Sequence, residues 1–142
     1  MANTFSNHFK FQLADKQVDL ANGGDTIKLV LMDTGFSFDK DADATWADVS
    51  ADALGAGNGY TGAITLSNQA LAEDDANDKA SATWDDETIT ASGGSIGPTP
   101  GAIVYDDTTS DDTIIMYIDF GSELTITDGN SLVIEDIEVK IE

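Results

Sequence analysis

The sequence predicts a mainly β protein: an antiparallel β-sandwich or jelly-roll-like fold, preceded by a short N-terminal helix. Two observations carry this prediction. About eight segments after residue 24 have the alternating apolar and polar residues of half-buried strands. Turn-forming residues separate these segments at intervals of roughly 8–12 residues, as in sandwiches and barrels. The chain has 142 residues, which fits one domain, so we assign residues 1–142 to a single sandwich domain.

The N-terminal helix is predicted for residues 4–20. Phe5, Phe9 and Leu13 recur at a spacing of four and would form one apolar stripe on such a helix. A helix this short is marginally stable in isolation. We therefore expect its apolar stripe to dock on another surface.

The first predicted strand lies in the stretch DTIKLVLMD, at residues 25–33. Apolar residues occupy both of its faces, so we expect most of both faces to be buried. From Tyr60 onward the pattern is entirely of the β type. The remaining predicted strands lie in the stretches YTGAITL, ASATWDD, ETITA, GAIVYDD, TIIMYIDFG, ELTIT and SLVIEDIEVKIE.

The last of these stretches contains an irregularity. Its apolar residues occupy even positions up to Ile134 and odd positions from Ile137 onward. A strict two-residue period cannot place both sets on one face of a sheet. We therefore predict a bulge or bend near Glu135 and Asp136.

A long segment, residues 33–59, separates the first strand from the others and is rich in Gly, Ala and Asp. Segments of this length are usually interaction surfaces or ordered excursions. Phe36, Phe38 and Trp46 are the residues that we expect to anchor it.

The charge of the chain excludes several classes of partner. Asp and Glu number 27 against six basic residues, all lysines, and the net charge is −21. Nucleic-acid binding needs a basic face, and an anionic membrane surface would repel this protein. Bound cations, a basic partner or a salty habitat would relieve the self-repulsion. Cysteine is absent, so the fold has no disulfide framework.

Catalytic motifs are weak. GGSIG at residues 93–97 matches the Gly-x-Ser-x-Gly nucleophile pattern, which requires a strand-to-helix turn and a later histidine. His8 is the only histidine, it precedes Ser95, and the residues after the motif lead into a predicted strand. A zinc site would need several His or Cys ligands. We therefore expect no enzymatic activity, no catalytic residue and no cofactor.

Calcium is the one metal that the sequence brings into consideration. Asp39, Asp41 and Asp43 are spaced like the first ligands of an EF-hand loop. Ala44 stands where that loop needs glycine, and Ser50 stands in place of its bidentate glutamate, so the EF-hand interpretation fails. A calcium site of looser geometry stays open there and in the acidic stretches EDDANDK and DDTTSDD.

The ordered segments resemble a group of small virion structural proteins of tailed bacteriophages. The resemblance rests on DTIKLVLMD, TWADVSA, GNGYTG, ATWDDETITA, GAIVYDD and MYIDFGSELTITDGNSLVI, in this order, and spans nearly the whole chain. These motifs are structural rather than catalytic. The chain departs from the pattern in SGGSIGPTPG, where the family passes almost directly from strand to strand.

The resemblance implies a capsid decoration or cement protein. Such a protein would be made in the host cytoplasm and would bind the major capsid protein on the outer surface of the virion. It would do so as a symmetric homo-oligomer, with a homotrimer at threefold positions favoured. The candidate interface residues are Phe5 and Phe9 of the helix and Phe36, Phe38 and Trp46 of the long segment. The terminal strand could instead pair with the sheet edge of a neighbour.

Two other functions stay open. A tail or head-fibre component that touches host carbohydrate would present exposed aromatic residues. A calcium-dependent binding module would show calcium-dependent thermal stability and no affinity for capsids.

Overall fold

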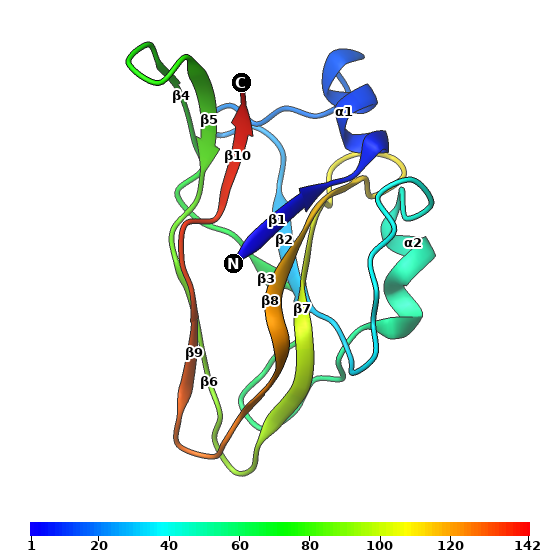
Figure 1. The fold of residues 1–142 in the computed structure, drawn as a ribbon, viewed down its shortest axis with the longest axis vertical. Helices are drawn as coiled ribbons and strands as arrows, with labels where there is room; N and C mark the ends of the chain where they lie inside the picture. Colours follow the sequence, from blue (N-terminus) through cyan, green and yellow to red (C-terminus); the bar gives the residue numbers. More distant parts are fainter.

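The structure is a computed structural model that describes residues 1–142. Two antiparallel β layers face each other across the core (Figure 1). One layer is a five-stranded sheet in the order β1-β8-β7-β2-β3, and the other consists of β10-β5-β4 together with β6-β9. The predicted fold class, a mainly β antiparallel sandwich with a short N-terminal helix, is confirmed.

The elements have the following bounds. The strands are β1 (Ala2–Phe5), β2 (Ile27–Leu31), β3 (Ile64–Thr65), β4 (Ala70–Asp74), β5 (Lys79–Thr83), β6 (Glu87–Thr90), β7 (Ile96–Asp106), β8 (Ile114–Ile126), β9 (Ser131–Ile134) and β10 (Glu138–Ile141). The helices are α1 (Asn7–Ala14), α2 (Trp46–Val49) and a 3-10 turn at Ser50–Asp52. None of the helices has the length and apolar character needed to cross a membrane.

The main core lies between the two layers. It is a cluster of 22 buried residues, to which the strands of both layers contribute alternate side chains. Leu29, Ala102 and Met116 come from the five-stranded sheet, and Ala82 and Val139 come from the second layer. All five are nearly or fully inaccessible to solvent.

The outer face of the five-stranded sheet is also buried. Most of the segment 33–59, up to Ala53, folds back over it, and Figure 1 shows α2 on the side of the sheet opposite the second layer. From Leu54 onward the chain packs against the main core instead. The segment's Phe36, Phe38 and Trp46 pack against a second cluster of seven buried residues. Trp46 stacks on Tyr105 with ring centroids 4.9 Å apart and planes 8° from parallel. The predicted burial of both faces of β2 is thereby confirmed.

The predicted irregularity of the last strand is a break between β9 and β10. Asp136 has a φ of 52°, and its N–H donates to the Asp86 side chain over 3.2 Å. Asp86 lies in the corresponding gap between β5 and β6. The β5–β6 segment and the β9–β10 segment therefore bend side by side. The bend predicted near Glu135 and Asp136 is confirmed.

The N-terminal helix is shorter than the predicted range 4–20. Residues 2–5 form β1, which pairs antiparallel with β8, and the helix begins only after Ser6. The backbone of β1 forms its hydrogen bonds with β8. This long-range interaction is not visible in the local spacing of the apolar residues. The stripe itself docks as expected, since Phe9 is 2% exposed while Phe5 and Leu13 pack against the core.

The β7–β8 hairpin differs most from the sequence prediction. Residues 96–100 of SGGSIGPTPG, which lie outside the predicted strands, belong to β7. The two predicted strands TIIMYIDFG and ELTIT form the single strand β8. Register shifts interrupt the pairing of these two strands at three places. Such bulges allow glycine and proline residues to lie within a strand, whereas the sequence pattern suggests that the strands end at these residues.

Candidate functional site

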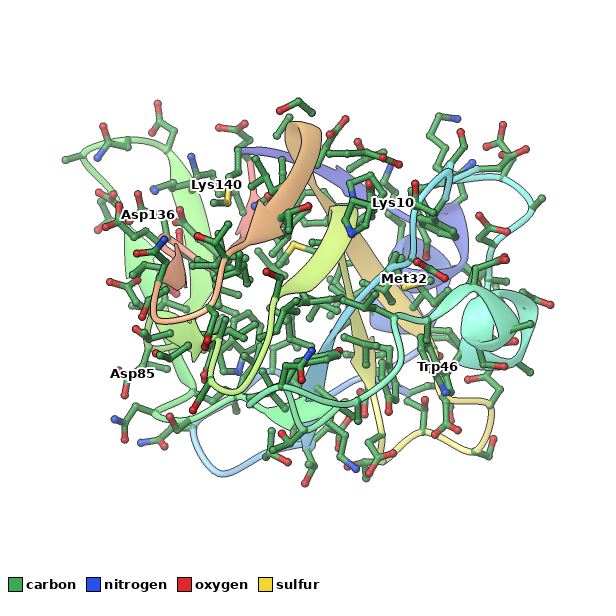
Figure 2. All side chains as sticks on the ribbon, turned by 90° about the horizontal axis from the view of Figure 1, so that it is seen from below. Lys10, Met32, Trp46, Asp85, Asp136 and Lys140 are labelled. Carbon is green, nitrogen blue, oxygen red and sulfur yellow. The ribbon has the colours of Figure 1, made fainter.

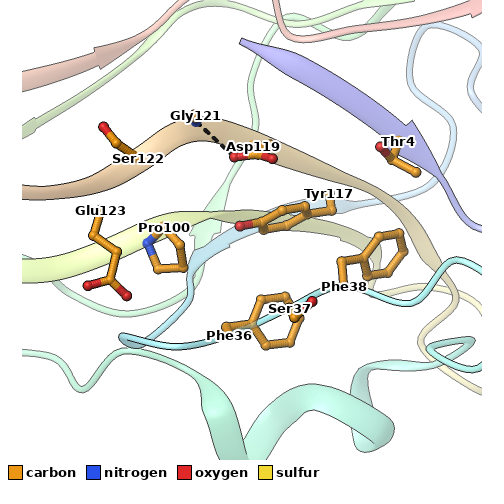
Figure 3. A pocket seen from close by; sticks show the side chains of 10 residues that line it. All are labelled: Thr4, Phe36, Ser37, Phe38, Pro100, Tyr117, Asp119, Gly121, Ser122 and Glu123. Carbon is orange, nitrogen blue, oxygen red and sulfur yellow. Dashed lines mark hydrogen bonds between the residues drawn. The ribbon is translucent and has the colours of Figure 1, made fainter.

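A cavity of about 370 Å³ opens on the outer face of the five-stranded sheet (Figure 3). It lies where the covering segment 33–59 stops short of β1 and the adjoining part of β8. This size is near the lower end of the range for ligand pockets. The lining residues are Thr4, Phe36, Ser37, Phe38, Pro100, Tyr117, Asp119, Gly121, Ser122 and Glu123.

Three aromatic rings form one wall of the cavity. Phe36 meets Tyr117 edge-on, with centroids 5.5 Å apart, and Phe38 meets Tyr117 at 5.6 Å. Tyr117 projects outward from β8, opposite Thr4 of β1 and Ile103 of β7. Phe36 and Phe38 are two residues apart on an extended stretch, so both can face the same sheet surface.

Gly101 of β7 makes room for the tyrosine ring. A Cβ atom at this position would lie 2.5 Å from the Tyr117 hydroxyl oxygen and 2.3 Å from the Ile118 carbonyl oxygen. Neither approach is sterically acceptable. The cavity therefore depends on a glycine beside the tyrosine on the neighbouring strand.

The hydroxyl group of Tyr117 lies inside the cavity. The residue is 7% exposed, and Figure 3 shows its oxygen directed toward Pro100 and Glu123. No other residue of the chain hydrogen-bonds to it. Burial, and then the charge of Asp119, raise the pKa of Tyr117 to about 12. The phenol is therefore neutral at physiological pH and can both donate and accept a hydrogen bond.

Two carboxylates stand at the rim. The Glu123 side chain accepts hydrogen bonds of 2.7 Å from the Thr34 hydroxyl and from the Gly35 N–H, and these bonds lower the pKa of Glu123. One oxygen of Asp119 accepts the Gly121 N–H at 2.8 Å. No lysine lines the cavity. Its negative charge is therefore not neutralised locally.

The predicted calcium residues form a tight turn. Asp39 Oδ1 accepts the N–H of Asp41 at 2.9 Å, and Asp43 Oδ2 accepts the N–H of Asp39 at 2.8 Å. Asp41 itself pairs with Lys40 at 2.8 Å and accepts a hydrogen bond from Asn7. No group of three or more His, Cys, Asp or Glu side chains has an arrangement suited to a metal ion. Calcium binding stays a prediction.

The acidic stretch DDTTSDD contains the most deeply buried carboxyl group. Asp106 is fully buried, and its Oδ1 accepts the Thr108 N–H at 2.8 Å. Its Oδ2 has no conventional donor nearby. Burial, together with a hydrogen bond between the Asp25 and Asp106 carboxyl groups, raises the pKa of Asp106 to about 7. Asp106 therefore keeps its proton to a higher pH than an exposed aspartic acid does.

The residues of the predicted interface occupy different environments. Phe9 is buried in the core, and Phe5 packs beside it with ring centroids 6.1 Å apart. Phe36, Phe38 and Trp46 are half-buried on the outer face, and the first two line the cavity. Contact of any of them with a partner stays a prediction.

His8 and Ser95, the residues of the weak nucleophile motif, have other partners. His8 Nε2 lies 2.8 Å from Asp111 Oδ2. The carbonyl of Ser95 accepts a hydrogen bond of 2.8 Å from the Asn58 side chain. Neither residue lines the aromatic cavity.

Sequence reasoning missed the cavity as a unit. Tyr117 lies in the predicted strand TIIMYIDFG, whose pattern gives no sign that the tyrosine hydroxyl group faces a cavity. The sequence does not indicate that Asp119, Gly121 and Glu123 line one cavity, because their placement depends on the irregular register of β7 and β8. The separation of Phe36 and Phe38 by one residue was the one available indication of a shared face.

Comparisons of the chain with protein-family models, with curated proteins and with solved structures find no match.

Proposed function

We propose that this chain is a structural protein of a tailed-bacteriophage virion, which decorates the outer capsid surface and stabilises the shell. The resemblance of its ordered segments to small virion proteins is one support. The observation that carries the proposal is electrostatic: the surface offers many carboxylates and very few free cations. Figure 2 shows carboxylate oxygens distributed around the periphery of the molecule.

The lysines contribute little to the outward charge. Four of the six take part in ion pairs within the chain: Lys28, Lys40, Lys79 and Lys140, whose closest N–O distances run from 2.8 to 3.8 Å. Such a surface complements a basic one. Electrostatic complementarity selects partners and accelerates their encounter more than it adds affinity. A basic patch on the major capsid protein is the partner that this charge fits.

Sheet edges offer a means of contact between subunits. β1 ends the five-stranded sheet and β10 ends the three-stranded one. An edge strand carries backbone donors and acceptors on its free side, so it can pair with a strand of a neighbour. We propose a homotrimer, because closed symmetry matches the threefold positions of a capsid lattice. Specific contacts of about 1,200–2,000 Å² each, repeated over many copies, would supply avidity.

The proposal is tested by co-sedimentation. Purified protein is mixed with capsids of the encoding phage that lack it, at about 0.05 M and about 0.5 M NaCl. We expect saturable binding at low salt that weakens at high salt. Absence of binding at low salt would contradict the proposal. Binding only to tails would support the fibre alternative instead.

A further inference from the structure

The aromatic cavity on the outer sheet face carries an unbalanced negative charge. Asp119 and Glu123 at its rim are both exposed, and the lining contains no lysine to offset them. Glu123 is held ionised by the donors of Thr34 and Gly35. Asp119 uses one oxygen for the Gly121 N–H, which leaves its other oxygen available to a guest.

The wall of the cavity suits a flat cation. Aromatic faces attract cations through the ring quadrupole, and guanidinium groups also stack on them. Three rings are available here: the ring centroids of Phe36 and Phe38 lie 5.5 and 5.6 Å from that of Tyr117.

An independent observation points to a ligand. Tyr117 is more than nine-tenths buried, yet its hydroxyl group faces the cavity without a partner in the chain. The hydroxyl oxygen itself is open to the cavity rather than sealed inside the protein, so water or a ligand in the cavity supplies its hydrogen bonds.

We infer that this cavity binds the guanidinium group of an arginine side chain presented by a protein partner. The guanidinium group stacks against the aromatic wall, donates to the free oxygen of Asp119 and donates to the hydroxyl oxygen of Tyr117. A lysine ammonium group lacks the planar fork needed for stacking and bidentate contact. A neutral sugar would leave the two carboxylates uncompensated. Such recognition applies to any partner with an exposed arginine, whether or not that partner is a capsid.

The test uses the isolated full-length protein and small probes. Nα-acetyl-arginine methylamide is titrated while amide ¹H–¹⁵N chemical shifts are followed. We expect saturable shifts at Gly121 and Gly101, with a Kd on the order of millimolar, because one side chain offers few contact atoms. Nα-acetyl-citrulline methylamide, of the same shape but uncharged, should bind at least about tenfold more weakly, since charge-assisted hydrogen bonds are roughly twice as strong as neutral ones.

Two variants remove single interactions and leave the aromatic rings in place. Asp119→Asn should weaken arginine binding about tenfold, and Tyr117→Phe about threefold, in line with the loss of a charged and a neutral hydrogen bond. Each has a matched control. Asp128 likewise accepts a glycine N–H, from Gly93 at 3.0 Å, and Tyr105 stacks elsewhere on the same face. Asp128→Asn and Tyr105→Phe should leave the Kd unchanged.

Several results would overturn the inference. Equal affinity for the citrulline and arginine probes would remove the role of charge, and equal affinity for a lysine probe would remove that of the guanidinium plane. A loss in Asp128→Asn as large as that in Asp119→Asn would indicate a general charge effect. Shifts at Gly121 with methyl glucoside but not with arginine would assign the cavity to carbohydrate. Because no capsid is present, these outcomes are separate from those of the capsid-binding test.

Discussion

Replacing Ser6 with alanine tests how firmly the N-terminal helix is attached to the sandwich. Ser6 is fully buried at the junction of β1 and α1. Its hydroxyl group donates to the Ile114 carbonyl over 2.6 Å and accepts the Phe9 N–H over 2.9 Å. The same side chain therefore caps the helix and ties it to β8.

The cost of Ser6→Ala can be worked out from these two bonds. Loss of an N-cap side chain costs about 0.5–2 kcal/mol. Leaving the buried Ile114 carbonyl without this donor costs about 1–3 kcal/mol more. We expect a loss of about 3 kcal/mol in the free energy of unfolding. In a domain of this size, each kcal/mol shifts Tm by about 2–4 °C, so Tm should fall by roughly 6–12 °C.

The assay is thermal unfolding followed by circular dichroism, with urea unfolding as a second measure. Ser67→Ala is the matched control, since Ser67 is exposed and contributes only its backbone carbonyl, to Asp85. The control should change stability by less than about 0.5 kcal/mol. A fall in Tm of under about 2 °C for Ser6→Ala would refute this reasoning and would indicate that the helix is loosely held.

Three further predictions concern the sheet, a buried acid and the net charge. Gly101→Ala should lower stability by about 1–3 kcal/mol in urea unfolding, because its Cβ atom would overlap the Ile118 carbonyl; Gly55→Ala, which has open space around it, should not. Because burial raises the pKa of Asp106 from 3.8 to about 7, the folded state holds a proton that the unfolded chain releases. The contribution of Asp106 to stability should therefore fall as pH rises from about 4 to about 7. Asp106→Asn should therefore reduce the fall of Tm with rising pH over this range. An equal fall in the variant and in the wild-type protein would contradict the role of Asp106. Raising NaCl from about 0.05 M to about 0.5 M should raise Tm, because salt screens the repulsion of a net charge of −21; a flat response would show that repulsion is unimportant.

Local sequence patterns predicted the elements whose geometry is local. The apolar run in β2 and the alternation in β5 and in the final segment predicted strands where they occur, and the phase change between Ile134 and Ile137 located the break between β9 and β10. The two-residue period reports which side chains share a face, and a change of phase has few physical causes. These parts of the fold needed no information about distant residues.

Elements that depend on distant partners were not predicted. β1 exists because β8 offers it an edge, and its residues otherwise resemble the first turn of a helix. β4 has no clear alternation, and it forms by pairing with β5. The aromatic cavity combines residues from β1, β7, β8 and the covering segment, so its geometry follows from register and bulges that a single sequence does not show.

The covering segment 33–59 links the fold to the proposed function. Its aromatic residues bury the outer sheet face, yet the segment ends short of β1 and leaves the cavity open beside a free sheet edge. A partner that pairs with β1 would therefore bring its side chains close to Phe38 and Tyr117. This proximity connects the two proposals, although each is tested separately.

Electron cryo-microscopy of capsids that lack the protein, imaged after purified protein is added, tests the central claim most directly. The account predicts regular density on the outer surface at symmetry positions, with carboxylates of each subunit against basic capsid residues. A bare shell, with density at the tail or nowhere, would contradict it.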